Sequence, residues 1–366
     1  MKAELLGMLA ALGAMVFSDS SAANVATDRA TAPDWSRPRV EGDAYMNPWR
    51  DPADRGERAG PGYILRKAAR QIGGRDGVDG RPEVLALDIA GMAREPFAVA
   101  WLGHASLLIH ANGRWVLVDP VLRETVGPLP GVGPKRFTPP ALTVDDLPPI
   151  DLILLSHDHF DHLDLPTLRS ITKRSGTTPR LLGGRGLEHL LDRSLRARLE
   201  VLEWWEQREI GGLKITFTPA QHGSGRSLAG KNRTLWGGWF LDGAPGRFYF
   251  AGDTADAPGL FEAIRLRLGA PDVAAIPVGA YAPRQWMRFE HLDPAEAHSA
   301  FRRVGARSGF GVHWGTFSLG EESPAETRAA FDAAAPIPDH DRFDLIPIGG
   351  WLPVRAAESP KLWRRR

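Results

Sequence analysis

Short apolar runs separated by turn residues recur along the chain, and they predict a series of strands. Residues 106–110 and 115–119 flank Asn112-Gly113, which is the strongest short-range signal for a β-hairpin turn. The mainly apolar run 150–156 is typical of a strand buried on both faces. Further strands are predicted over residues 213–218, 235–241, 247–251, 273–277, 309–313 and 343–348.

Helices are predicted between these strands. Asp293 and Ser323 stand where N-caps are expected, and proline follows each of them at the first helical position. Strands in runs with helices interspersed indicate a layered α/β protein with mixed sheets. The predicted helices span residues 166–171, 187–196, 258–268, 294–304 and 324–334.

Composition and charge limit the chemistry. The chain has 366 residues, with 45 Lys and Arg against 44 Asp and Glu, which gives a net charge of +1. No broad basic footprint for a nucleic-acid backbone is present, so we expect no nucleic-acid partner. The chain has no cysteine, which excludes disulfides, thiolate catalysis and cysteine-based zinc sites. Any metal must therefore be held by His, Asp and Glu.

The N-terminus has the pattern of a targeting segment. Lys2 precedes the apolar run 5–17, and mostly small residues follow over 18–23. The apolar run is short for a bilayer span. We therefore predict a signal peptide over residues 1–23 and an exported protein, either periplasmic or membrane-associated. The alternatives are an uncleaved anchor and a plain N-terminal helix. The plain helix is consistent with a cytoplasmic protein.

The organisation after this segment follows from composition. Residues 24–60 are rich in Pro, Arg, Asp and Gly without periodicity, which predicts an extended arm that wraps around the following domain. Helical spacing over 62–73 predicts a docking helix, or else a helix that makes a peripheral membrane contact. The main domain is expected over 61–356, with a basic tail over 357–366. The long Pro- and Gly-rich loop 120–149 is of a length that is usually functional.

A dense histidine and aspartate motif directly follows the strand that ends at Ser156. His157, His159, Asp161 and His162 form the pattern H-x-H-x-D-H. The loop is short, so the imidazoles can converge beyond the end of the strand, with His157 and His159 facing one ion and Asp161 and His162 another. The alternatives are a solvated polar loop and a helical His-Asp phosphohydrolase. The apolar strand that leads into the motif argues against the helical one.

Three further candidate ligands each follow an apolar strand. They are His222, Asp253 and His313. Singly, each would more often be structural. Together with the first motif they supply five His and two Asp at strand ends, and this combination favours a metal site over a structural role for each residue. A nitrogen and oxygen ligand set suits zinc, and manganese or iron would also fit.

The order of these ligands resembles the metallo-β-lactamase superfamily pattern. Within that superfamily, the surrounding segments are similar to the N-acyl-phosphatidylethanolamine-hydrolysing phospholipase D family. The resemblance covers about residues 45–325. The segments that carry it are 47–49, 101–105, 133–137, 147–151, 204–206, 250–254, 276–281, 291–294 and 313–317.

The resemblance implies a four-layer αββα sandwich with two mixed β-sheets, and two Zn²⁺ ions per chain. It also places His291 and Tyr281 at the substrate. One departure from the family is Gly223, where a large aromatic residue is usual, and it predicts a more open loop over 223–234. The implied ligands are His157, His159 and His222 for one ion, Asp161, His162 and His313 for the other, and Asp253 as the bridge between them.

The expected chemistry follows from two adjacent divalent ions. They lower the pKa of a bridging water and hold the hydroxide as nucleophile. Asp161 and Asp253 act on this centre as catalytic ligands, and Asp161 orients the hydroxide. His291 stabilises the phosphate or protonates the leaving alkoxide. His104 and Asp119 are expected to orient ligands, because a ligating imidazole usually donates its other N–H to a carboxylate or carbonyl.

The sequence therefore predicts a dinuclear zinc-dependent hydrolase. The favoured activity is that of a phospholipase D-type phosphodiesterase acting on N-acyl-phosphatidylethanolamine or a related phospholipid. The runner-up is a lactonase or β-lactamase-type hydrolase on the same metal site. A non-catalytic lipid-binding protein is a third hypothesis, although such a protein has no need of seven metal-ligand residues.

Overall fold

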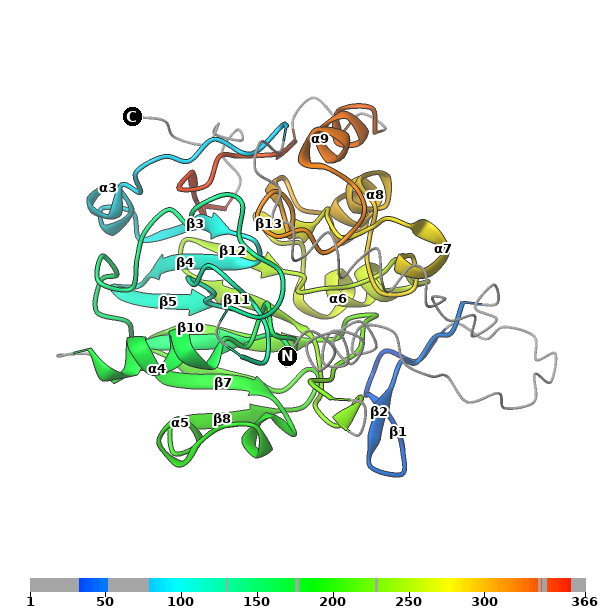
Figure 1. Ribbon diagram of the computed structural model, residues 1–366, viewed down its shortest axis with the longest axis horizontal. Helices are drawn as coiled ribbons and strands as arrows, with labels where there is room; N and C mark the ends of the chain where they lie inside the picture. Colours follow the sequence, from blue (N-terminus) through cyan, green and yellow to red (C-terminus); the bar gives the residue numbers. More distant parts are fainter. Residues whose placement is uncertain are drawn as a thin grey trace, which may run out of the picture.

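Two mixed β-sheets packed face to face form the centre of the molecule, and helices cover their outer faces (Figure 1). The computed structural model describes residues 33–51 and 79–356, apart from positions 130, 175–177, 228–229, 335–336 and 338–340. This arrangement is the four-layer αββα sandwich, so the predicted fold class is confirmed. The predicted N-terminal signal segment, the helix over 62–73 and the basic tail lie outside the described residues.

The first sheet carries the predicted hairpin and the strand before the histidine motif. Its order is β16-β3-β4-β5-β6-β7-β8, antiparallel from β16 to β5 and parallel from β5 to β8. Asn112 and Gly113 both adopt positive φ in the β4–β5 turn, as a two-residue hairpin turn requires. The strands are β3 (Phe97–Gly103), β4 (Ser106–Ala111), β5 (Arg114–Val118), β6 (Leu152–Leu155), β7 (Arg180–Gly184), β8 (Leu199–Leu202) and β16 (Trp351–Pro353).

The second sheet carries the remaining predicted strands. Its order is β15-β14-β13-β12-β11-β10-β9, antiparallel from β9 to β12 and parallel from β12 to β15. Large side chains from both sheets, among them Trp101, Phe217 and Trp239, are fully buried between them. The strands are β9 (Gln207–Ile210), β10 (Leu213–Thr218), β11 (Gly238–Gly243), β12 (Gly246–Phe250), β13 (Val273–Pro277), β14 (Ser308–Val312) and β15 (Arg342–Asp344).

The helices begin where their caps predict. Asp293 and Ser323 both form complete capping boxes, with Glu296 and Glu326 as the reciprocal acceptors. Near α4, a second apolar core forms between the first sheet and its outer helices. The helices are α3 (Ile89–Ala93), α4 (Leu165–Lys173), η1 (Leu187–His189), α5 (Arg193–Arg196), α6 (Leu260–Leu268), α7 (Arg284–Met287), α8 (Pro294–Val304) and α9 (Pro324–Asp332).

Some predicted boundaries were wrong. The helix predicted over 187–196 is two short helices, because the Asp192 carboxylate accepts the N–H groups of Ser194 and Leu195 and starts a new helix there. Strand β11 begins three residues later than predicted. The N–H of Leu235 instead donates to the carbonyl of Arg185, which belongs to a loop of the first sheet.

The described part of the predicted N-terminal arm, residues 33–51, contacts the loops that follow β8, β10 and β12. Its only regular part among these residues is the hairpin of β1 (Arg39–Glu41) and β2 (Ala44–Met46), drawn in blue in Figure 1. Trp35 anchors the arm: its side chain is buried, and its indole N–H donates to the carbonyl of Pro258 at 2.9 Å.

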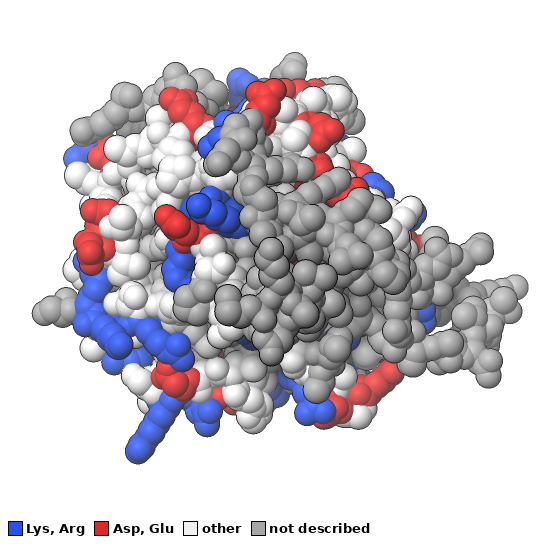
Figure 2. All heavy atoms as spheres, viewed as in Figure 1, with Lys and Arg blue, Asp and Glu red and all other residues white. Residues whose placement is uncertain are grey.

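Acidic and basic side chains are mixed over the described surface on the face shown in Figure 2. Among the exposed ion pairs of the described residues, Arg169 pairs with Asp192 and Arg180 with Glu200. Within residues 33–51 and the described part of 79–356, no helix is long and apolar enough to cross a membrane.

Candidate metal centre

The structure brings the seven predicted ligand residues together at one edge of the sandwich. Each lies directly after, or within seven residues of, the end of a buried strand, and together these strands come from both sheets. The loop 157–162 follows β6 of the first sheet. The other three residues follow strands of the second sheet: His222 comes after β10, Asp253 after β12 and His313 after β14.

Three histidines form the first set. The Nε2 of His157 lies 2.9 Å from the Nδ1 of His159, and that Nδ1 lies 3.3 Å from the Nε2 of His222. All three ligand atoms are within 4.8 Å of one another. His157 and His222 are almost fully buried, so water does not compete freely for these nitrogens.

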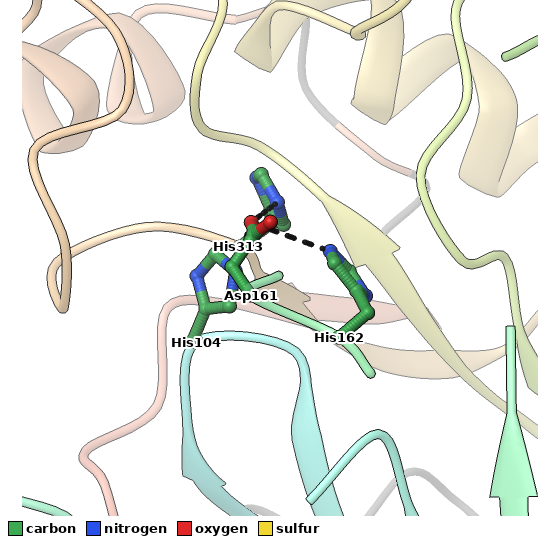
Figure 3. Close-up of side chains that lie close together, drawn as sticks. All are labelled: His104, Asp161, His162 and His313. Carbon is green, nitrogen blue, oxygen red and sulfur yellow. Dashed lines mark hydrogen bonds and ion pairs between the residues drawn. The ribbon is translucent and has the colours of Figure 1, made fainter. Parts of the chain in front are cut away.

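One carboxylate and two histidines form the second set. Figure 3 shows the Asp161 carboxylate among the rings of His104, His162 and His313. Its Oδ2 lies 3.6 Å from the Nε2 of His162 and 3.5 Å from the Nε2 of His313. These side chains come from the motif loop and from the end of β14.

Asp253 joins the two sets. Its Oδ2 lies 3.2 Å from the Nε2 of His162 and 3.0 Å from the Nε2 of His313. The same oxygen lies 3.8 Å from the Nε2 of His222 and 3.9 Å from the Nε2 of His157. A single buried carboxylate oxygen is therefore shared between the two sets.

These distances fit a pair of metal sites. Tetrahedral ligands at roughly 2.0–2.1 Å from a zinc ion lie about 3.3 Å from each other. In the second set, the distances from the Oδ2 atoms of Asp161 and Asp253 to the Nε2 atoms of His162 and His313 are 3.0–3.6 Å. The Nε2 atoms of His162 and His313 are buried and have no hydrogen-bond partner within the described part of the chain, although both face carboxylate oxygens. A cation would satisfy these nitrogens and neutralise the carboxylates.

The rings of His157, His162 and His222 are oriented by contacts of their Nδ1 atoms with groups outside the ligand set. The Nδ1 of His162 donates to Asp119 at 2.8 Å, and the Nδ1 of His157 lies 2.9 Å from the hydroxyl of Ser156. That hydroxyl donates to the same Asp119 oxygen at 2.5 Å. The Nδ1 of His222 donates to the carbonyl of Glu290 at 2.9 Å. In each ring the Nε2 is thus left to face the cluster.

His104 holds the carboxylate of the second set. Its Nε2 donates to the Oδ2 of Asp161 at 2.9 Å, and its ring lies against that of His313 with centroids 4.2 Å apart. Its backbone N–H donates to the hydroxyl of Thr316 at 2.8 Å. Burial lowers the pKa of His104 to about 3, so the ring is neutral and donates through a single N–H.

The charges of the cluster compensate one another. Burial lowers the pKa of His159 to about 3 and that of His157 well below its ordinary value, so both rings are neutral near pH 7. Burial also opposes charge on His313, but Asp253 and Asp161 outweigh it and raise its pKa to about 9. Burial would raise the pKa of Asp253, but His162 and His313 hold it well below its usual range.

The two residues expected at the substrate occupy different positions. His291 lies at the cluster: its Nδ1 is 4.0 Å from the Oδ2 of Asp253, and its ring is 5.3 Å from that of His313. Tyr281 is not among the described residues that the structure brings into contact with the cluster; its hydroxyl interacts with Thr327 of α9. Burial and the nearby Glu322 raise the pKa of Tyr281 to about 12.

The loop after His222 is tied to the histidine motif by residues that the sequence reasoning did not single out. The N–H of Gly225 donates to the Asp158 carboxylate at 2.6 Å. Arg226 donates to the carbonyls of Asp158 and Leu163, and its guanidinium lies 3.9 Å from the centre of the Phe160 ring. Gly225 and Asp158 are 67 residues apart in the sequence, so no local pattern indicated this contact.

Comparisons with known proteins agree with this geometry. The family model of the β-lactamase superfamily domain matches residues 114–314. N-acyl-phosphatidylethanolamine-hydrolyzing phospholipase D 1 of Caenorhabditis elegans is 37% identical over 228 residues, which are 60% of this chain and 64% of the worm protein. The matched region thus spans just under two thirds of that relative's length.

Two further matches come from more distant proteins. A metal-dependent hydrolase of Methanopyrus kandleri is 32% identical over 62% of this chain and 88% of its own. The crystal structure of an isothiocyanate hydrolase from Delia radicum gut bacteria superposes with a TM-score of 0.54 at 19% identity. It covers 71% of this chain and 100% of that one, and at this identity the likeness concerns the fold.

Proposed function

Because the chain belongs to the β-lactamase superfamily, and is a metal-dependent hydrolase of that fold, we propose that it is a dinuclear zinc-dependent phosphodiesterase of the phospholipase D type. The proposed substrate is N-acyl-phosphatidylethanolamine or a related glycerophospholipid. The proposed location is exported or membrane-associated, in keeping with the pattern of residues 1–23.

The observation that carries the proposal of two ions is the position of Asp253. Its Oδ2 lies 3.0–3.9 Å from histidine nitrogens of both sets. A mononuclear site needs no such shared oxygen, whereas a dinuclear site needs a ligand within reach of both ions. The residues proposed to hold one ion are His157, His159 and His222, those for the other are Asp161, His162 and His313, and Asp253 contacts both.

The protein's own groups determine how a substrate is held. When bound, two divalent ions would polarise a phosphoryl oxygen of the substrate and would lower the pKa of a bound water toward neutrality. Asp161 is held by the N–H of His104, so its carboxylate keeps one orientation toward the centre. The surrounding residues are buried, which limits the access of bulk water to the reacting atoms.

His291 is proposed to contact the substrate phosphate or the leaving alkoxide. Its ring lies between those of His222 and His313, with centroid separations of 5.2 Å and 5.3 Å. Its Nδ1 is buried and lacks a hydrogen-bond partner among the described residues. A spare imidazole nitrogen beside the metal ligands suits hydrogen bonding or proton transfer to a bound oxygen.

The phosphodiester proposal is supported by the similarity to the worm phospholipase D at 37% identity. The fold alone does not select it, because one fold serves many reactions. The all-nitrogen-and-oxygen ligand set is compatible with a phosphodiester and equally with a lactone or a β-lactam. The substrate class therefore requires a direct assay.

The test is turnover of bis(p-nitrophenyl) phosphate and of N-acyl-phosphatidylethanolamine in detergent micelles, with and without a chelator. We expect both substrates to be cleaved, with release of phosphatidic acid from the lipid, and we expect chelation to abolish both activities. Turnover should return on adding Zn²⁺. Metal-loaded protein that cleaves neither phosphodiester but hydrolyses a lactone or β-lactam would overturn the phospholipase assignment and keep the hydrolase.

A further inference from the structure

The N-terminal arm reaches the metal centre from outside the matched domain. Its described part comprises residues 33–51, whereas the family model matches residues 114–314. Two tryptophans fix it to the sandwich: the indole of Trp35 donates to the carbonyl of Pro258, and the indole of Trp205 donates to the carbonyl of Trp35 at 2.6 Å. The arm is therefore held at its start, well before it arrives at the ligands.

Within the arm, Asn47 makes a two-point contact with the backbone of His222. The Nδ2 of Asn47 donates to the His222 carbonyl at 2.7 Å, and the His222 N–H donates to the Oδ1 of Asn47 at 3.2 Å. A side-chain amide offers one donor side and one acceptor side, so it can pair with a residue's N–H and C=O as a neighbouring strand would. His222 lies beyond the end of β10, where it has no strand partner of its own.

Neighbouring contacts keep Asn47 in register with this segment. The N–H of Tyr45 donates to the carbonyl of Asn232 at 2.7 Å, and the side chain of Gln221 donates to the carbonyl of Trp49 at 3.1 Å. Alternate residues 45, 47 and 49 thus all bond to the chain around His222. Figure 1 shows the β1–β2 hairpin, which contains Tyr45 and leads into Asn47 and Trp49.

The ring of His222 is held by a second segment, to which the arm is also tied. The carbonyl of Glu290 accepts from the Nδ1 of His222. In the same segment, Arg288 donates to the carboxylate of Asp51 in the arm at 3.0 Å. The backbone and the ring of His222 are thus both positioned by groups that lie outside its own loop.

We propose that Asn47 is a positioning residue of the metal centre, through which the N-terminal arm fixes the His222 ligand. The inference rests on the proposed dinuclear site and deepens it. His222 belongs to the set with His157 and His159, so Asn47 acts on one of the two ions and not on the other. The arm is then a part of the metal site.

The test compares Asn47→Asp and Asn47→Ala with the wild-type full-length protein. The aspartate has nearly the same shape and still accepts from the His222 N–H, but it cannot donate to the His222 carbonyl. Arg39→Ala is the matched control, because Arg39 lies in the arm, and its exposed side chain pairs with Glu41 of the same hairpin. Zn²⁺ binding is measured by competition with a chromogenic chelator, together with thermal unfolding in EDTA.

We expect one of the two Zn²⁺ dissociation constants to rise by about 10–100-fold in both Asn47 variants, as for other partners of metal ligands. The second constant, and both constants of Arg39→Ala, should stay at the wild-type values. Unchanged constants in both Asn47 variants would overturn the inference and leave the proposed function standing. Equal weakening of both ions would also overturn it, since that indicates a general loss of structure. A wild-type protein that binds no Zn²⁺ would overturn both.

Discussion

At the scale of single residues, the geometry of the ligands depends on buried acceptors outside the ligand set. Asp119 accepts from the His162 ring, from the Ser156 hydroxyl and, through Oδ1, from the Ser156 N–H at 2.8 Å. It has no exposed surface. One carboxylate therefore sets the orientation of His162 directly and that of His157 through Ser156.

Replacing Asp119 by asparagine tests this dependence. The amide keeps the shape of the carboxylate. Its nitrogen is a donor only, however, so in the place of Oδ2 it can accept neither from the imidazole nor from the hydroxyl. We expect Zn²⁺ affinity to fall by about 10–100-fold, measured by chelator competition. Asp146→Asn is the control, because Asp146 accepts from the backbone N–H and the hydroxyl of Thr143 and bonds to none of the proposed ligands. Wild-type affinity in Asp119→Asn would contradict the role given to Asp119.

His159 offers a second test at this scale, since it is a proposed ligand within the motif itself. His159→Ala should lose metal and at least 100-fold of the hydrolytic rate, because the first set keeps only two of its three imidazoles. The matched control is His189→Ala, whose side chain is 80% exposed. Full activity with full metal content in His159→Ala would refute the assignment of the first set.

The residues that the structure brings together in the candidate site were named from the sequence, whereas several of the groups that hold them in place were not. The H-x-H-x-D-H spacing is local, so the motif could be read directly, and His222, Asp253 and His313 were visible at strand ends. The carbonyl of Glu290 and the contact of Gly225 with Asp158 could not be foreseen. Backbone acceptors carry no sequence signal, and these pairs are brought together by tertiary structure alone.

At the scale of elements, the predictions succeeded where local signals are strong. The β4–β5 hairpin and the capped helices α8 and α9 match because turn and cap residues mark their ends. Strand β3 was not predicted although all seven of its residues are buried. The periodicity of a continuous apolar run does not by itself distinguish a buried strand from a buried helix segment, so its assignment depends on packing from both sides.

The cap of α8 gives a stability prediction. The Asp293 carboxylate accepts the Glu296 N–H at 2.9 Å, and Glu296 accepts the Asp293 N–H at 3.0 Å. Asp293→Ala should lower the free energy of unfolding by about 1 kcal/mol, measured by urea denaturation of the metal-free protein. Ser323→Ala, the equivalent change in α9, should have a similar effect. A cost below about 0.3 kcal/mol for both would show that the capping boxes contribute little.

Glu322 gives a pH prediction for the turn after β13. Its carboxylate accepts the N–H groups of Ala280 and Ala282 at 2.6 Å and 3.0 Å, and burial raises its pKa above the ordinary value. A carboxyl with a raised folded-state pKa stabilises the fold below its unfolded pKa, and this contribution is lost as the pH rises through the folded value.

The measurement is thermal unfolding of wild type and Glu322→Gln in EDTA between pH 4.5 and pH 8. The glutamine does not titrate, so the stability of wild type relative to the variant should fall as the pH rises. The lost hydrogen bond to one amide adds only a constant offset. A difference that is independent of pH, or that grows in favour of wild type, would contradict the raised pKa of Glu322.

At the scale of the whole molecule, the candidate metal centre joins the two sheets. Its proposed ligands come from a loop of the first sheet and from three strand ends of the second. Asp253 and His313 follow strands of the second sheet, and His162 follows a strand of the first. The Oδ2 of Asp253 lies 3.2 Å from the Nε2 of His162 and 3.0 Å from the Nε2 of His313. Bound ions would therefore link the two halves of the sandwich.

Metal removal should accordingly destabilise the whole fold. An ion that binds only the folded state adds about 2.7 kcal/mol to stability when its free concentration is 100 times its dissociation constant. We expect EDTA to lower the melting temperature in a single transition, and Zn²⁺ to restore it. An unchanged melting temperature would show that the centre does not link the two sheets.

The central claim is that two metal ions share Asp253, and metal stoichiometry tests it most directly. The measurement is elemental analysis of purified protein after exhaustive dialysis, for wild type and for Asp253→Ala. The account predicts about two ions per chain in the wild type and a loss of metal in the variant, because both ions lose a ligand. One ion or fewer in the wild type, or two ions retained in Asp253→Ala, would contradict the shared dinuclear centre.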